Sequence, residues 1–254
     1  MWNGGRRGIV VDIETTTDIS SIRGTIRDGF GNLDTVIDIE RVVGTRFNVV
    51  FVGSWTDNVF AAAEGVDSYD GQAGFDAINF GWSFGNTPPG EAVVDLARAT
   101  GQIQNDGFGN AETAISIKMI WGADGNDRFS GNALDNFIEG VKGSDVMTGR
   151  AGIDTFYWDG DYDLDAVDRV TDFTATGVAA DRLAFDVASD VGMTGTAVVV
   201  NGTAATQAVG TFFYNAANDR LFWDRDGAAV APAVAVVVLT NVASLSAANF
   251  DLFV

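Results

Sequence analysis

The chain has 254 residues, 46% of them hydrophobic, which is enough for one large domain or two modest ones. Its formal net charge of −20 argues against nucleic acid and anionic membranes as partners. It contains neither cysteine nor histidine, which excludes disulfides, the zinc-protease motif and every Ser-His-Asp or Cys-His arrangement. We expect no Sec signal peptide, because the first residues lack an apolar stretch, and no membrane insertion, because no apolar run approaches ~20 residues.

Residues 1–80 are predicted to form the first copy of an internal repeat. A short strand at 10–13 is followed by the turn DGFGN at 28–32, and the same turn recurs at 106–110. At this offset of 78, residues 28–80 align with residues 106–158 without a gap, and twenty of the 53 positions are identical. The chain therefore contains two copies of a pattern made of a strand, a turn, a second strand and four nine-residue repeats.

Residues 81–121 are predicted to be a connection followed by the first strands of the second copy. The segment 81–85, GWSFG, matches the G-x-S-x-G nucleophile motif. That motif needs a strand-to-helix turn and a histidine base, so Ser83 is predicted to be a loop residue and not a nucleophile.

Residues 122–157 repeat every nine residues, as GADGNDRFS, GNALDNFIE, GVKGSDVMT and GRAGIDTFY. Position one is always glycine, position six is Asp or Asn, and position eight is apolar. Glycine permits a sharp turn whose carbonyls face one way, and the residue at position six adds a side-chain oxygen. Calcium takes six to eight oxygen ligands at flexible distances, so two stacked turns of this kind suit it. The apolar residue at position eight is expected to point inward from a three-residue strand.

These nonapeptides resemble the RTX (hemolysin-type) calcium-binding repeat, G-G-x-G-x-D-x-U-x. The resemblance implies an all-β fold, a parallel β-roll or β-solenoid, in which turns eighteen residues apart stack. The turn 122–127 would then stack on 140–145, and the turn 131–136 on 149–154. The candidate metal-site residues of this block are Gly122, Asp124, Asp127, Gly131, Asn136, Gly140, Lys142, Asp145, Gly149 and Asp154.

The first copy keeps the apolar position eight in its turns 44–80, but it has lost most ligands at position six. Its turns 44–61 are predicted to be structural, and Asp67 and Asp76 are the remaining candidate ligands. Asp57, and Asp135 in the second copy, are alternative carboxylates that sit one place early in their repeats.

Residues 159–254 are predicted to form a β-rich cap that covers the last turn of the solenoid. An acidic run from Asp159 to Asp168 imitates an EF-hand loop but has Ala166 at the required glycine, so we expect a solvated loop. The alternation at 211–214 and 220–223 predicts a hairpin, and 234–239 a buried strand.

The C-terminal third resembles the region that follows the repeats in serralysin-type secreted proteins, and the ending at 249–254 resembles their type I secretion signal. The chain departs from that group in having no catalytic domain and no histidine to build one. The expected organisation is thus 1–80, a degenerate first copy; 81–121, a connection with strands; 122–158, the calcium-binding block; and 159–254, the cap with its secretion signal.

The sequence therefore predicts a non-enzymatic extracellular protein that folds on calcium after export by the type I secretion machinery. One alternative is the C-terminal calcium-binding and secretion module of a larger secreted enzyme or adhesin. Another is a module that binds an extracellular polysaccharide, similar to the repeat modules attached to alginate epimerases. Few basic residues lie along the roll, so its charge opposes an anionic polymer unless calcium bridges the two.

Overall fold

The structure is a computed structural model that describes residues 10–12, 23–27, 32–37, 39, 41–81, 88, 90–159, 166–186, 198–206, 210–226 and 232–253. It divides into two compact units, Met1–Ala123 and Asp124–Val254, which are described separately. The division falls inside the first nonapeptide of the second copy, so the compact units do not coincide with the two copies. In the described residues, the only helix is the short 3₁₀ helix η1 (Ala247–Asn249). No helix in this part of the chain is long and apolar enough to cross a bilayer.

Unit 1 stacks its nonapeptide strands on two faces. One face has the strand order β11-β7-β5-β1-β2-β3 and the other the order β12-β8-β6-β4, while β9 and β10 form an antiparallel pair. Strands β5, β6 and β7 are each the last three residues of a nonapeptide, and they pair in parallel with strands eighteen residues away. The strands of unit 1 are β1 (Val10–Asp12), β2 (Arg23–Arg27), β3 (Leu33–Ile37), β4 (Arg41–Val43), β5 (Val50–Val52), β6 (Val59–Ala61), β7 (Ser68–Asp70), β8 (Asp76–Asn79), β9 (Ala92–Asp95), β10 (Ile103–Asp106), β11 (Thr113–Ile115) and β12 (Ile117–Trp121).

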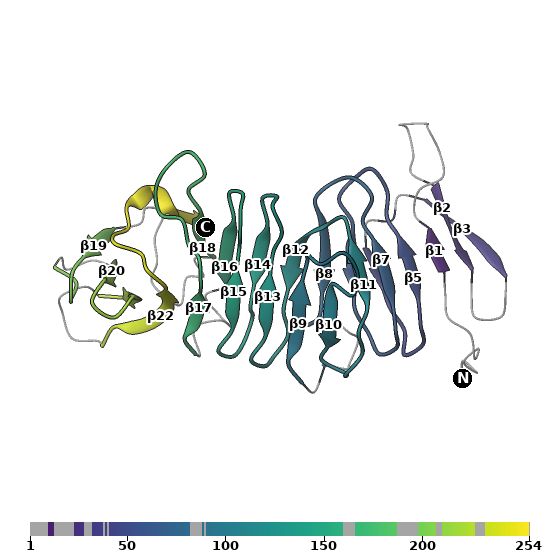
Figure 1. The fold of residues 1–254 in the computed structure, drawn as a ribbon, viewed down its shortest axis with the longest axis horizontal. Coiled ribbons are helices and arrows are strands. Elements are labelled where there is room, and N and C mark those ends of the chain that lie inside the picture. The colour runs from purple at the N-terminus through teal and green to yellow at the C-terminus, as the bar shows by residue number, and fades with distance from the viewer. Residues whose placement is uncertain are drawn as a thin grey trace. The chain divides into compact units, whose positions relative to one another are not determined.

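Unit 2 likewise places its strands on two faces. One face has the order β13-β15-β17-β22-β21-β20-β19 and the other the order β23-β18-β16-β14. Figure 1 shows β13 to β16 as successive short rungs joined by tight turns. The strands of unit 2 are β13 (Arg128–Ser130), β14 (Phe137–Glu139), β15 (Val146–Thr148), β16 (Thr155–Asp159), β17 (Asp168–Val170), β18 (Arg182–Asp186), β19 (Val199–Asn201), β20 (Thr211–Asn215), β21 (Arg220–Asp224), β22 (Val234–Leu239) and β23 (Phe250–Phe253).

The predicted stacking interval of eighteen residues is confirmed. Arg128 pairs with Val146 and Phe137 with Thr155, both in parallel register. Successive nonapeptides therefore alternate between the two faces, and each turn lies on the turn two repeats away. The fold is the expected all-β parallel β-roll.

The core of each unit is a ladder of the residues at position eight. Because side chains alternate across a strand, the middle residue of each three-residue strand points inward and its neighbours point outward. These core residues are at most 1% exposed. They are Phe51, Phe60, Tyr69 and Ile78 in unit 1, and Phe129, Ile138, Met147 and Phe156 in unit 2.

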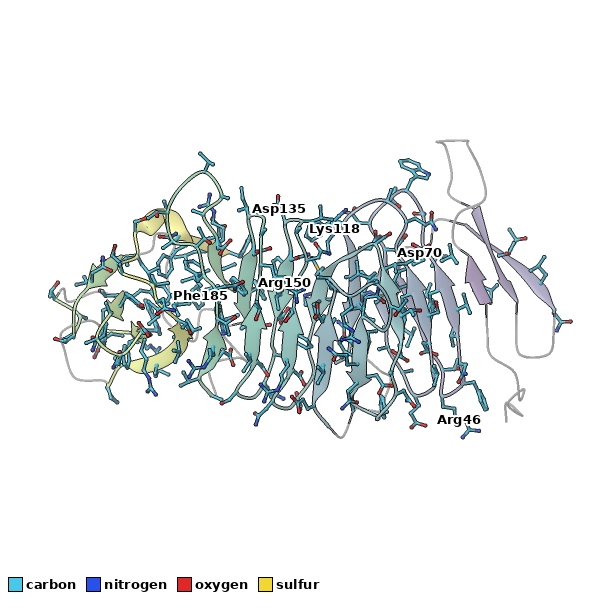
Figure 2. The ribbon with its side chains drawn as sticks, viewed as in Figure 1. Arg46, Asp70, Lys118, Asp135, Arg150 and Phe185 are labelled. Atoms are coloured by element: carbon cyan, nitrogen blue, oxygen red, sulfur yellow. The ribbon has the colours of Figure 1, made fainter. Side chains whose placement is uncertain are left out.

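The C-terminal end of unit 2 is closed by the strands that follow the repeats. β22 pairs in parallel with β17, and β23 pairs in parallel with β18. The predicted hairpin is confirmed as the antiparallel pair β20–β21, and the predicted strand 234–239 is β22. Phe185, labelled in Figure 2, lies in an aromatic core with ring centroids 5.2 Å from Trp158 and 4.9 Å from Phe212. The cap thus buries the last rungs of the roll, as a solenoid requires.

Ser83 of the nucleophile-like motif lies outside the described residues.

Candidate metal centre

A ladder of side-chain oxygens joins the stacked turns of unit 2. On one side, the backbone N–H of Asp127 donates to Oδ1 of Asp145 at 2.7 Å. The N–H of Asp145 in turn donates to Oδ1 of Asp168 at 2.8 Å. The carboxylates of Asp145 and Asp168 therefore each reach back to the preceding turn on the same side, 18 and 23 residues earlier, and cap its backbone.

The second side of unit 2 repeats the arrangement. The N–H of Asn136 donates to Oδ1 of Asp154 at 2.8 Å, and the N–H of Asp154 donates to Oδ1 of Asp181 at 3.0 Å. Both sides place acidic side chains between turns, where two turns can contribute oxygens to one ion.

The glycines of the repeat are explained by close approach and by backbone conformation. A Cβ on Gly149 or Gly140 would collide with the carboxylate of Asp154 or Asp145 in the same turn. Gly143 and Gly152 at position four have φ of +118° and +126°, which side chains rarely adopt. Position one thus makes room for the carboxylate, and position four makes the turn.

The carboxylates between the turns are buried. Asp127, Asp145 and Asp154 are at most 1% exposed. Burial raises the pKa of Asp154 to about 7; the hydrogen bond from Asn136 lowers it, and the charges of Asp181 and Asp172 raise it further. Its Oδ2 has no hydrogen-bond partner among the residues that the structure describes. A buried carboxylate with an open oxygen among other carboxylates is stabilised by a cation.

The donor set suits a hard divalent cation with mainly carbonyl ligands. In the described residues, no three His, Cys, Asp or Glu side chains come together at metal-binding distances. An ion held here therefore needs backbone carbonyls in addition to carboxylates, and calcium accepts that mixture. The residues fit calcium on both sides: Asp145 on one side and Asp154 on the other would each hold an ion through a carboxylate, and the glycine turns of that side would hold it through their carbonyls. The bound ion would neutralise the buried charge and cross-link the stacked turns.

The two candidates at position three lie at the outer edge of the turns. Lys142 Nζ is 3.3 Å from Asp124 Oδ1, and both side chains are largely exposed. The carbonyl of Lys142 accepts a hydrogen bond from Gly125 N at 2.9 Å. Lys142 is itself a cation, so only its carbonyl could serve as a ligand. Gly122 falls at the end of unit 1, and its carbonyl lies 2.8 Å from where a Cβ of Gly81 would be.

Arg150 brings a second cation close to a turn of the block. Its Nη1 donates to the carbonyl of Gly131 at 2.6 Å, and its backbone N–H donates to Oδ2 of Asp172 at 2.8 Å (Figure 2). Gly131 and Gly149 are the first residues of the two turns involved, so this guanidinium lies at the edge of the predicted site.

Residues at position five form an outer ladder that the sequence interpretation did not identify. Oδ1 of Asp135 accepts from Ile153 N at 2.7 Å, and Oδ1 of Asp57 accepts from Phe75 N at 2.7 Å. Asn126 and Asn48 make the same contact eighteen residues ahead. In the structure Asp57 and Asp135, the alternative ligands, therefore cap backbone N–H groups; Figure 2 shows Asp135 at a turn end.

The two candidate ligands of the first copy have donors of their own. Oδ1 of Asp67 accepts from Val49 N at 2.7 Å, and its Oδ2 accepts from the hydroxyl of Tyr69 at 3.1 Å. Oδ1 of Asp76 accepts from Asn58 N at 2.9 Å. Burial raises the pKa of both aspartates to about 6.

The expectation of a solvated acidic loop is wrong for Asp168. This side chain is 1% exposed, and its Oδ2 accepts a hydrogen bond from Trp158 Nε1 at 2.7 Å. The reason is that Asp168 takes the next place in the ladder after Asp145. Residues 160–165 of the acidic run lie outside the described residues.

Three ladder residues lie outside the nonapeptides. They are Asp168 and Asp181 in unit 2 and Glu112 in unit 1, whose Oε1 accepts from Asp67 N at 2.9 Å. Each stands two residues before a buried apolar side chain of a strand, Val170, Leu183 or Ala114, which is the spacing of positions six and eight. This acidic-x-apolar triplet without glycine is the signal that would have found them.

Comparison with known proteins agrees with the geometry for one segment. A search of curated proteins found no match to the chain. Residues 120–157 match the family model of the RTX calcium-binding nonapeptide repeat, in four copies. These residues carry the two pairs of stacked turns, with the glycine pattern and the buried aspartates described above. Residues 120–157 are therefore a block of RTX-type calcium-binding repeats.

Proposed function

We propose that this chain is a non-catalytic calcium-binding protein that works outside the cell, where calcium sets its β-roll after type I export. The observation that carries the proposal is the buried ladder carboxylate Asp154, which has an open oxygen and an acidic neighbourhood. RTX repeats are typical of secreted proteins, and they occupy the matched segment. Because the sequence contains no histidine, it cannot form a Ser-His-Asp or Cys-His arrangement, and neither arrangement supports a catalytic role.

Calcium would act as a folding switch. The net charge of −20 opposes a compact state, and the ladder adds carboxylates that are costly to bury. Extracellular calcium modules bind at roughly 10⁻⁴ to 10⁻³ M, which separates the cytosol from the medium. The block is thus expected to be poorly ordered at cytosolic calcium and ordered at millimolar calcium, because metal binding supplies folding free energy.

The test is a calorimetric calcium titration of the wild type, Asp145→Asn and Asp154→Asn, with circular dichroism in chelator and in calcium. Each substitution removes a charge from one side of the ladder and is expected to weaken one binding event by at least about tenfold. Asp219→Asn is the matched control, because Asp219 lies in the hairpin turn with φ +59°, where Asn is equally suited.

Two results would contradict the calcium proposal. One is an unchanged stoichiometry and affinity in both ladder variants. The other is an equal β-signal for the wild type in chelator and in calcium.

Export is tested separately at the C-terminus. Residues 250–253 form β23, which pairs with β18 and stands at the end of its sheet order. Its acidic-apolar ending supports a role as a secretion signal, so deletion of residues 251–254 is expected to abolish export by a cognate type I transporter. Normal export of the truncated chain would leave the calcium proposal standing and remove the export route.

A further inference from the structure

The position-six side chains that cap successive turns form four columns, two in each unit. The third residue of one column differs in charge from the third residue of the other three. After two nonapeptide rungs, the third rung is Glu112, Asp168 or Asp181 in three columns. In the fourth column the rungs are Asn58 and Asp76, and the strand that follows is β12. Its register aligns Ile120 with Ile78, so the residue two places before the buried apolar side chain is Lys118. A lysine therefore stands where the other columns have a carboxylate.

A β-bulge directs this lysine toward the turn. Ile117 pairs with Asp76 and Met119 with Ala77, which leaves Lys118 as an extra residue on β12. Bulges re-aim side chains relative to a regular strand. The ammonium group of Lys118 donates a hydrogen bond to the carbonyl of Gly74, in the turn 71–76 (Figure 2).

The carboxylate beside this ammonium is incompletely satisfied by hydrogen bonds. Asp76 is 0% exposed, and within the described part of the chain its Oδ2 has no hydrogen-bond partner. Burial raises its pKa, the Asn58 hydrogen bond lowers it, and the charge of Lys118 lowers it as well. In the RTX block, the groups that would hold calcium are a carbonyl of a glycine turn and a position-six carboxylate. Here the Lys118 ammonium donates to the Gly74 carbonyl, and its charge lowers the pKa of Asp76.

We propose that the ammonium group of Lys118 holds the place of a divalent cation at the turn 71–76, so that this turn is a latent calcium site which closes without metal. The inference rests on the proposed function of the RTX block. The other column of unit 1 supports it, because the Tyr69 hydroxyl donates to Oδ2 of Asp67 there. Unit 1 thus places a hydroxyl group at one ladder aspartate and a positive charge near the other, whereas the proposed function assigns this role to calcium at Asp154 of the RTX block.

The test uses amide hydrogen exchange of the full chain, in chelator and in calcium at about 10 mM, above the range of extracellular modules. The variants are Lys118→Met, which removes the charge, and Lys118→Asp, which restores the carboxylate of the other columns. Arg98→Met is the control, because Arg98 is an exposed cation of unit 1 in the connection between β9 and β10. The readout is the exchange rate of amides 68–79, with amides 137–148 followed in the same sample.

In the wild type and Arg98→Met, amides 68–79 are expected to exchange equally in chelator and in calcium. In Lys118→Met they are expected to exchange at least about tenfold faster in chelator, because a charged hydrogen bond and a counter-charge are lost, and calcium should restore protection. Lys118→Asp should show the larger calcium effect and one additional ion in a calorimetric titration.

The inference is overturned if calcium protects amides 68–79 in neither variant, or if it already protects them in the wild type. Amides 137–148 report on the proposed function independently. If these show no calcium protection in any sample, the calcium-dependent folding of the RTX block fails, whatever the result at Lys118.

Discussion

The packing between stacked turns can be tested at a single glycine. Gly152 stands at position four with φ +126°, and a Cβ added to it would lie 2.7 Å from both the carbonyl carbon and the carbonyl oxygen of Leu134. Gly177 provides the matched control, because it has φ +103° but nothing within 4 Å of an added Cβ. Gly152→Ala and Gly177→Ala thus introduce a similar backbone strain, and only the first forces two turns apart.

The expected destabilisation follows from these contacts. A side chain in such a backbone conformation costs about 1–3 kcal/mol in either variant. Gly152→Ala also has to move its turn away from the turn 131–136, at an overpacking cost of about 1–3 kcal/mol. That movement lengthens the hydrogen bond from Asn136 N to Asp154 Oδ1, which is 2.8 Å. We therefore expect a loss of about 2–6 kcal/mol for Gly152→Ala and about 1–3 kcal/mol for Gly177→Ala.

Urea unfolding at saturating calcium, followed by circular dichroism, measures the difference in unfolding free energy. A calcium titration of the same variants should show weaker binding in Gly152→Ala only, because the separated turns no longer contribute oxygens to one ion. Equal unfolding free energies and equal calcium affinities for the two variants would refute the stacking geometry on which the site depends.

Three further predictions concern pH and the core. Burial raises the pKa of Asp154 to about 7, so the folded state binds more protons than the unfolded state between about pH 4 and 7; in chelator the melting temperature should therefore fall as pH rises through this window, and calcium should remove the fall. Burial also raises the pKa of Glu112 to about 9, so Glu112→Gln, which mimics the protonated acid, should raise the urea midpoint at pH 8 but not at pH 4; a lower midpoint at pH 8 would contradict this. Met147→Ala leaves a cavity at a ladder position that is 0% exposed and should lower the unfolding free energy by about 2–5 kcal/mol, whereas a loss under about 1 kcal/mol would indicate a loosely packed core.

The nine-residue period was sufficient to predict most of the roll. It indicated which residues point inward, as Phe129 and Phe156 do, because side chains alternate along a strand. The eighteen-residue stacking of Asp127 on Asp145 was implied by the resemblance to the RTX repeat, and the structure confirms it. The hairpin of β20 and β21 was equally visible, since alternating apolar residues flank a polar turn.

The ends of the ladder could not be predicted in the same way. Asp168 and Asp181 follow irregular insertions, so they are out of phase with the period, and only the finished register brings them beside Asp145 and Asp154. The proposed role of Lys118 depends on a β-bulge in β12, and no sequence pattern predicted this bulge. The capping role of position five was not predicted, because an aspartate one place early resembles a ligand; in the structure Oδ1 of Asp135 accepts a hydrogen bond from a backbone N–H.

The ladder gives the roll a direction of assembly. In all four described columns, the side chain at position six caps the backbone of the turn that precedes it in the chain. A turn therefore obtains its acceptor from residues further toward the C-terminus. If ordering begins at β17 and β18, each turn that joins finds its acceptor already fixed, and the roll can close toward the N-terminus one rung at a time. Ordering in the opposite direction would leave the newest N–H group unsatisfied at every step. The residues that follow the repeats thus supply acceptors to the last turns of the RTX block, through Asp168 and Asp181, in addition to covering the core of unit 2.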